Sequence, residues 1–242
     1  MRAIVALILM GSVVWPVAAQ TPAPEQGREV KYVRDSEEYA AIARWVYRAA
    51  QQSVEAQVRA LPRGRAWAVA LDVDETALDN TAYELERRAY LQPHDEAVFA
   101  AWIARRESGA VPGVVEFIAA VRRLGGRVAW ITNRLEPTRQ NTQANLERVG
   151  LWNANDRLCL MNPADTAYTK QARRREVATG SGACGWGEPA TVLAFVGDQL
   201  GDIPRAGEMD QDAGRDEAFG VRYFLLPNPM YGSWERMVTR RR

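Results

Sequence analysis

Short apolar runs alternate with amphipathic segments over most of the chain. Apolar residues recur at helical spacing from about Ser36 to Leu61, and Asp35 or Ser36 can cap the N-terminus of a helix there. Further helices are predicted at about 114–124 and 137–149. Strands are predicted between these segments at Ala66–Leu71, Val128–Ile131, Leu158–Met161, Thr191–Val196 and Val221–Leu226. Strands that alternate with helices in this way predict an α/β fold with a doubly wound parallel sheet.

Residues 77–112 interrupt this alternation with an Ala-rich stretch that also carries aromatic side chains. We expect a mostly helical insertion there. Ligands of doubly wound sheets bind beyond the carboxyl ends of the strands. We therefore predict that the insertion forms a small helical lid over that end of the sheet and contributes a wall of the substrate site.

The first nineteen residues have the pattern of a secretory signal peptide. Arg2 precedes an apolar run, and Val17-Ala18-Ala19 supplies small residues for cleavage before Gln20. An uncleaved anchor is the alternative, although the run is short for a bilayer span. We predict a periplasmic or secreted protein without a stable membrane anchor after cleavage, with a flexible segment over 20–34 and one domain over 35–242.

Charge and cysteine content narrow the choice of partners and compartment. The chain has 31 Lys and Arg against 30 Asp and Glu, a balance that argues against a nucleic acid polymer as partner. The composition does not define an oligomeric state, so an oligomer stays possible. Export would place Cys159 and Cys184 in an oxidising compartment. Either a disulfide between them or two buried thiols fits their spacing.

Carboxylates follow the first predicted strand. Asp72 and Asp74 come directly after Ala66–Leu71. Like charges this close are unfavourable unless a cation or a shared proton compensates them. A divalent ion with oxygen ligands is the natural compensation.

The later strands end in groups that suit phosphate chemistry. Thr132 closes the second strand with a hydroxyl, and Lys170 opens the helix after the third. The fourth strand runs into Asp198, with Asp202 four residues later. All of these lie at predicted carboxyl ends, where they would share one crevice.

This ordered set resembles the four motifs of the haloacid dehalogenase (HAD) superfamily, and within it the class C acid phosphatases and their 5′-nucleotidase relatives. The resemblance covers roughly residues 35 to 238. Finer matches to that subfamily are Leu71-Asp72-Val73-Asp74-Glu75-Thr76 followed by Leu78-Asp79-Asn80, Val111-Pro112-Gly113 with Glu116-Phe117, Thr132-Asn133-Arg134 and the C-terminal Leu226-Pro227-Asn228-Pro229-Met230-Tyr231-Gly232-Ser233-Trp234-Glu235.

The resemblance implies an acid phosphatase domain with a HAD-like Rossmannoid core. It implies a Mg²⁺-dependent phosphomonoesterase that forms an aspartyl-phosphate on Asp72, with Asp74 as acid and then base. It also implies that Thr132 and Lys170 bind the phosphoryl group. The implied Mg²⁺ ligands are Asp72, the Asp74 carbonyl, Asp198 and Asp202.

Substrates are expected to be small phosphomonoesters, with nucleoside monophosphates or other aromatic esters as the leading class. The candidate substrate contacts are the polar pair after Thr132 and three aromatic residues: Asn133, Arg134, Tyr83, Trp102 and Tyr231. Each aromatic residue has the alternative of a buried core position. His94 is expected to lie in a loop, and the run Arg173–Arg175 is expected to be exposed to solvent.

Two other functions fit the same resemblance. One is phosphotransfer from the aspartyl-phosphate to an alcohol. The other is a non-catalytic binding or storage protein on the same fold, although plant proteins of that kind commonly lack the nucleophile that Asp72 supplies here.

Overall fold

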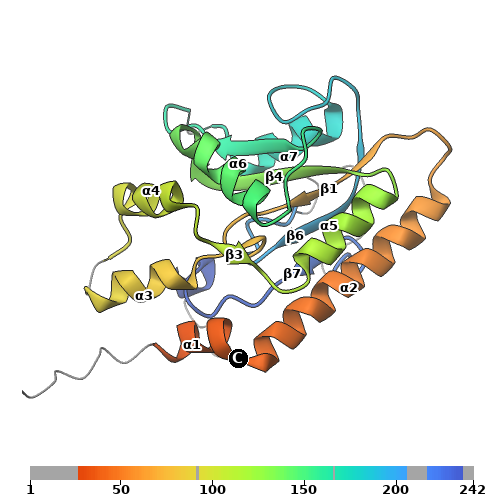
Figure 1. The fold of residues 1–242 in the computed structure, drawn as a ribbon. Helices are drawn as coiled ribbons and strands as arrows, with labels where there is room; N and C mark the ends of the chain where they lie inside the picture. Colours follow the sequence, from red (N-terminus) through yellow and green to blue (C-terminus); the bar gives the residue numbers. More distant parts are fainter. Residues whose placement is uncertain (1–26, 91–92, 166, 206–216, 237–242) are drawn as a thin grey trace, which may run out of the picture.

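The computed structural model describes residues 27–90, 93–165, 167–205 and 217–236, and its centre is a five-stranded sheet (Figure 1). The strands are β1 (Trp67–Leu71), β4 (Arg127–Leu135), β5 (Arg157–Met161), β6 (Thr191–Gly197) and β7 (Tyr223–Leu225). Their order is β5-β4-β1-β6-β7, and every adjacent pair is parallel. The chain therefore winds outward from β1 in both directions, which confirms the predicted doubly wound α/β sheet.

Two strands differ from their predicted ranges. β4 continues to Leu135, four residues beyond Ile131, and its pairing with β5 is irregular between Ile131 and Leu135. β7 begins only at Tyr223, because the backbone N–H groups of Val221 and Tyr223 both donate to the carbonyl of Ala218 in a turn. Apolar content alone does not separate such a turn from a strand.

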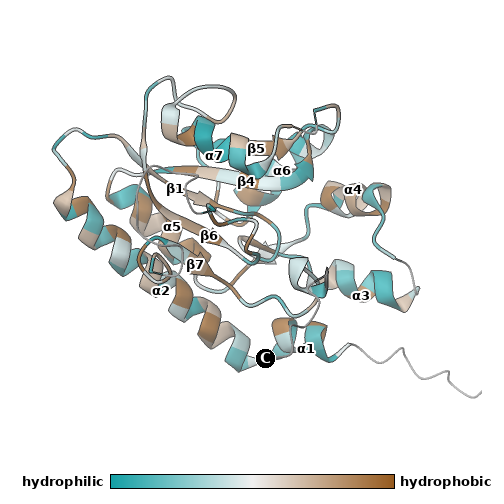
Figure 2. Ribbon diagram, turned by 180° about the vertical axis from the view of Figure 1, so that it is seen from behind, coloured by the Kyte–Doolittle hydropathy of each residue, from teal (hydrophilic) through white to brown (hydrophobic). Residues whose placement is uncertain are grey.

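Helices cover both faces of the sheet (Figures 1 and 2). α2 (Glu37–Ala60) and α5 (Val114–Arg123) pack on one face, and α6 (Arg139–Arg148), preceded by the 3₁₀ turn Glu136–Thr138, adds Leu146 to the same core. α7 (Lys170–Thr179) packs on the opposite face through Val177. Successive strand residues point to opposite faces, so β1 serves both cores.

The N-terminal part of the domain starts earlier than predicted. Residues 28–34, expected to be flexible, belong to α1 (Arg28–Asp35), in which Val30 and Val33 are buried. α1 packs against α2 and α3, a contact that an eight-residue pattern does not reveal. Ser36, and not Asp35, caps α2, since its hydroxyl accepts from the backbone N–H of Tyr39.

The insertion is a helical lid, as predicted. It contains α3 (Thr81–Ala89) and α4 (Glu96–Arg105), which project from one end of the sheet (Figure 1). The short antiparallel strands β2 (Leu78–Asp79) and β3 (Gly109–Ala110) join its two ends at the base. The lid thus leaves and rejoins the core at one point beside the end of β1.

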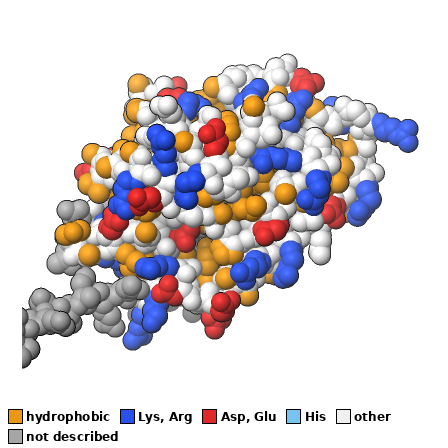
Figure 3. Space-filling model, viewed as in Figure 1, with side chains coloured by type: hydrophobic (Ala, Val, Ile, Leu, Met, Phe, Trp, Pro, Cys, Tyr) orange, Lys and Arg blue, Asp and Glu red, His pale blue; other side chains and the backbone are white. Residues whose placement is uncertain are grey.

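Cys159 in β5 and Cys184 after α7 form a disulfide, which settles the alternatives left open by their spacing. Positive and negative side chains are interspersed over the face drawn in Figure 3. Within the described residues, no helix combines the length and the apolar character needed to cross a bilayer. The predicted signal peptide over 1–19 lies outside the described residues.

Candidate functional site

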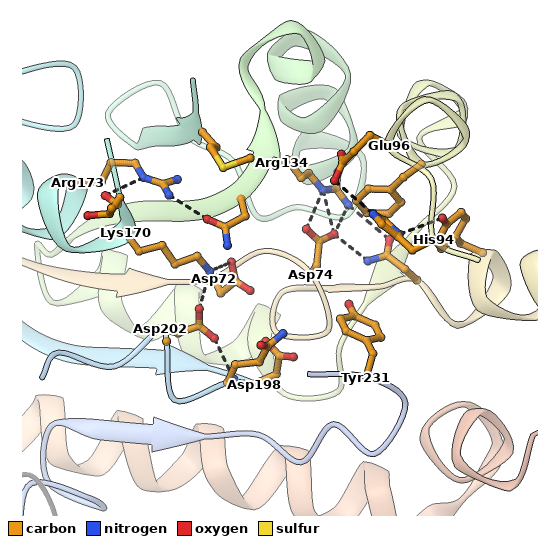
Figure 4. A pocket seen from close by; sticks show the side chains of 18 of the residues that line it. Asp72, Asp74, His94, Glu96, Arg134, Lys170, Arg173, Asp198, Asp202 and Tyr231 are labelled. Carbon is orange, nitrogen blue, oxygen red and sulfur yellow. Dashed lines mark hydrogen bonds and ion pairs between the residues drawn. The ribbon is translucent and has the colours of Figure 1, made fainter. Parts of the chain in front are cut away.

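Asp72, Asp74, Lys170, Asp198 and Asp202 line a cavity of ≈ 570 Å³ at the carboxyl ends of the strands (Figure 4). Thr132 is fully buried and does not line it. Asp72 follows β1, Asp198 follows β6, and Lys170 is the first residue of α7. Because parallel strands all end on one edge of a sheet, side chains distant in sequence face a common space. The lid supplies the opposite wall.

A sharp turn after β1 lets both Asp72 and Asp74 face this cavity. Glu75 has a φ of 52°, in the left-handed region that few residues other than glycine adopt. Its N–H donates to the carbonyl of Leu78 at 2.8 Å, which holds the turn closed. Strained residues of this kind are often found where a site must be shaped.

Lys170 joins two carboxylates on one side of the cavity. Its Nζ lies 2.6 Å from Oδ1 of Asp72 and 2.5 Å from Oδ1 of Asp202. Burial by itself favours the neutral amine, but the two carboxylates outweigh it and raise the pKa of Lys170. Lys170 is therefore a fixed positive charge beside the predicted nucleophile.

The carboxylates themselves are crowded. Burial raises the pKa of Asp72 well above its usual range, against the effect of Lys170. Burial, with the charge of Asp202, raises the pKa of Asp198 to about 7. Asn228 donates to Asp198 at 2.7 Å and opposes that shift. Asn228 belongs to the C-terminal motif, and the sequence alone assigns no contact to it.

The same carboxylates fit a divalent cation. Oxygen atoms of Asp72, Asp198 and Asp202 lie within 4.8 Å of one another. Asp72 and Asp198, both buried and with raised pKa values, need positive charge nearby, and hard oxygen donors suit Mg²⁺. The carboxylate of Asp74 is not part of this group. Its predicted ligand atom was the backbone carbonyl.

Asp74 occupies the other side of the cavity, where Arg134 binds it (Figure 4). The guanidinium Nε and Nη2 of Arg134 lie 2.9 Å and 2.8 Å from Oδ1 of Asp74. The Thr132 hydroxyl, expected to face phosphate, donates to Oδ2 of Asp74 at 3.4 Å. Arg134 lines the cavity as predicted for a substrate contact, yet its guanidinium is committed to Asp74.

Arg173 corrects the expectation that the run Arg173–Arg175 is solvated. It is 1 % exposed, and Arg174 is also buried. Arg173 donates to the carbonyls of Thr132 and Cys159 and to the side chain of Asn133, all near the ends of β4 and β5. Its position three residues after Lys170 places it on the same side of α7, the one signal that could have found it.

The aromatic residues divide into two groups. Tyr83 and Tyr231 line the cavity, together with Phe99 and His94. His94 lies in the loop before α4, as expected, and its Nδ1 is 3.2 Å from the Tyr83 hydroxyl. Trp102 is 3 % exposed and does not line the cavity, because its indole is turned into the lid. Trp102 therefore occupies a buried core position in the lid, the alternative to a substrate contact.

Comparison with known proteins agrees with this geometry. The family model of the HAD superfamily, subfamily IIIB (acid phosphatase), matches residues 12–234. The class C acid phosphatase of Bacillus anthracis has a similar structure, with a TM-score of 0.70 and 25 % identity over 88 % of this chain and 87 % of that one.

Plant proteins are also similar in sequence. Acid phosphatase 1 of Solanum lycopersicum is 29 % identical over 163 residues, or 66 % of this chain and 56 % of the tomato protein. Stem 28 kDa glycoprotein of Glycine max is 23 % identical over 165 residues, or 66 % and 57 %. The chain thus aligns with somewhat more than half the length of these relatives. Since the family model matches most of the chain, the protein belongs to the acid phosphatase subfamily IIIB of the HAD superfamily.

Proposed function

We propose that this protein is a Mg²⁺-dependent phosphomonoesterase that acts through an aspartyl-phosphate on Asp72. The observation that carries the proposal is the setting of Asp72, a buried carboxylate at the end of β1 that accepts from Lys170 and lies beside Asp198. The class C acid phosphatase of Bacillus anthracis has been solved with tungstate bound, and tungstate is a tetrahedral oxyanion like phosphate.

The residues on the two sides of the cavity suit the two halves of this reaction. A carboxylate oxygen of Asp72 forms a bond to phosphorus while the bond from phosphorus to the leaving oxygen breaks. Asp74 donates a proton to that oxygen. It then accepts a proton from the water that attacks phosphorus and frees Asp72 from the phosphate.

Charge around the phosphoryl group is the other requirement. Lys170 lines the cavity and would face the transferring oxygens. The hydroxyl of Thr132, which donates to Oδ2 of Asp74 in this structure, would turn to bind them. Asp72, Asp198 and Asp202, with the Asp74 carbonyl, would hold Mg²⁺. When bound there, Mg²⁺ would supply positive charge to the crowded carboxylates and to the phosphoryl oxygens.

Hydrolysis of 4-nitrophenyl phosphate by the wild type and by Asp72→Asn, each with Mg²⁺ and with EDTA, tests this function. EDTA should abolish turnover by the wild type, and Asp72→Asn should lower kcat by more than about 100-fold, since the amide is a poor nucleophile. The control is the melting temperature of the variant, which should show a folded protein. Hydrolysis that survives in EDTA, or in the variant, would refute the proposed mechanism.

We further propose that the preferred substrates are aromatic phosphomonoesters, with nucleoside monophosphates first among them. Tyr83, Phe99 and Tyr231 line the cavity. Stacking on such rings contributes about 1–3 kcal/mol for each base, or roughly five- to 150-fold in kcat/KM.

Substitution of Tyr231 tests this preference. We expect Tyr231→Ala to lower kcat/KM for nucleoside monophosphates by at least about fivefold while changing that for glycerol phosphate much less. Equal changes for the two substrates would remove Tyr231 from the substrate contacts.

Export of the protein is part of the same proposal. The disulfide between Cys159 and Cys184 supports an oxidising compartment, such as the periplasm or the medium. Mass spectrometry of protein from its host should find Gln20 as the first residue. Recovery of an intact N-terminus at Met1 would contradict cleavage.

A further inference from the structure

We propose that Trp102 and Ser108 in the lid are positioning residues, which act through Asn80 to orient the carboxylate of Asp74 toward the leaving group. The inference rests on the proposed function, because it takes Asp74 to be the general acid. It gives the buried indole of Trp102 a role other than substrate stacking.

The side-chain amide of Asn80 can adopt only one orientation in this site. Its Oδ1 accepts from the indole N–H of Trp102 at 3.1 Å and from the hydroxyl of Ser108 at 2.7 Å. A flipped amide would turn its own N–H group toward the indole N–H, which can only donate, and its oxygen toward the carboxylate of Asp74. The Nδ2 group of Asn80 therefore points the other way, where it donates to Oδ1 of Asp74 at 2.8 Å.

The lid donors are themselves firmly held. Trp102 lies in α4 and packs against Tyr83, with ring centroids 6.3 Å apart. The guanidinium of Arg105 covers its ring at 4.6 Å. Ser108 is 2 % exposed and precedes β3 at the base of the lid. Asn80 is also buried, so water does not replace either donor readily.

Arg134 restrains Asp74 from the core side. Its Nε lies within 3.2 Å of both carboxylate oxygens, and its side chain is fully buried. Nη2 of Arg134 also lies 3.4 Å from Oδ1 of Asn80, the residue that donates to Asp74. Asp74 is thus held by Arg134 of β4 on one side and by Asn80 of the lid on the other. Loss of a lid donor should let Asn80, and with it the carboxylate, rotate.

A misplaced general acid has a specific kinetic signature. It slows esters whose leaving group needs a proton and has little effect where the leaving group departs readily as an anion. Phenyl phosphate and 4-nitrophenyl phosphate have the same ring, but 4-nitrophenol is much the stronger acid. Stacking and phosphate binding are closely matched between them, so their ratio reports on proton donation.

The experiment is to measure kcat/KM for both esters with Trp102→Phe, which keeps an aromatic ring and removes the N–H. We expect the loss for phenyl phosphate to exceed the loss for 4-nitrophenyl phosphate by about three- to tenfold, the worth of one buried hydrogen bond. Trp186→Phe is the matched control. Its indole N–H donates to the carbonyl of Asn155, away from the cavity, and it should keep the wild-type ratio.

Ser108→Ala removes the second donor with a smaller change in volume and should shift the ratio in the same direction. Equal losses for the two esters in both variants, or a larger loss for 4-nitrophenyl phosphate, would overturn the inference. Asp74→Asn distinguishes the acid role of Asp74 from the positioning role of Trp102 and Ser108. If Asp74→Asn itself shows no preference between the esters, the proposed acid is wrong. If it does and the lid variants do not, only the positioning role fails.

Discussion

Buried arginines hold the strand ends of this site together. Arg173 reaches the carbonyls of Thr132 and Cys159 and the amide of Asn133 with one guanidinium. Five N–H donors in a rigid planar fork make such a set of contacts possible, and a lysine ammonium has only three donors on one atom. Burial lowers the pKa of Arg173, although it stays charged because an arginine starts so high.

Arg173→Lys should therefore lower the free energy of unfolding by about 2 kcal/mol or more, because at least one buried carbonyl loses its partner. Urea denaturation measures the change. Arg175→Lys on the same helix is the matched control, since Arg175 is exposed, and it should stay within about 0.5 kcal/mol of the wild type. Equal effects of the two substitutions would show that the buried contacts of Arg173 contribute little.

The loop after β6 shows a constraint at the scale of an element. A Cβ on Gly197 would lie 2.2 Å from Cβ of Asp202 and 2.5 Å from its Oδ2. The loop folds back this closely because Oδ2 of Asp202 accepts from the N–H of Gln199 at 2.9 Å, which leaves Oδ1 for Lys170. Only glycine permits that approach.

Gly197→Ala should displace Asp202 and weaken Mg²⁺ binding by about tenfold or more, the usual effect of disturbing a ligand's support. Isothermal titration of Mg²⁺ measures this. Gly109→Ala is the control, since a Cβ there meets nothing within 4 Å, and it should bind Mg²⁺ as the wild type does. Unchanged affinity in Gly197→Ala would place Asp202 outside the metal site.

At the scale of the whole molecule, the metal-free carboxylate cluster should make stability depend on pH. The pKa of Asp198 is raised to about 7 in the folded protein, whereas an unfolded Asp titrates near 4. The folded state thus holds an extra proton between these values. The stabilisation of the folded state by this proton is fully present below about pH 4 and is lost as the pH rises through about 7.

In EDTA, the melting temperature of the wild type should therefore fall between pH 5.5 and pH 8 relative to that of Asp198→Asn, which has no such proton to lose. Mg²⁺ should restore the wild type most at pH 8, because it binds the ionised carboxylates. Differential scanning calorimetry of both proteins checks this. A wild type that gains stability over Asp198→Asn as the pH rises in EDTA would contradict it.

The disulfide links β5 to the segment that follows α7. Cys159 and Cys184 are 25 residues apart in sequence, and their loop includes all of α7. The chain-entropy model gives roughly 3–4 kcal/mol for closing a loop of this size. Replacing both cysteines by alanine should lower the free energy of unfolding by about that amount, measured in urea. A change below about 1 kcal/mol would indicate that α7 is held by its packing alone.

The sequence by itself determined the parallel sheet and the residues at the carboxyl ends of its strands. Strands buried on both faces are written as continuous apolar runs, and parallel strands must all end at one edge. The residues that follow those runs, among them Asp72, Lys170 and Asp198, therefore share a cavity whatever the detailed packing. Their positions directly after the predicted strands are the reason that their convergence could be predicted.

Only the tertiary structure decided which way the remaining side chains turn. Arg173 and Arg175 look alike in sequence, but one is buried and the other exposed. The pairing of Arg134 with Asp74, the turn of Trp102 into the lid and the bond between the cysteines also depend on contacts between segments far apart in the chain. Local periodicity reports the spacing of apolar residues along one element, and it holds no information about which distant partner a polar group will meet.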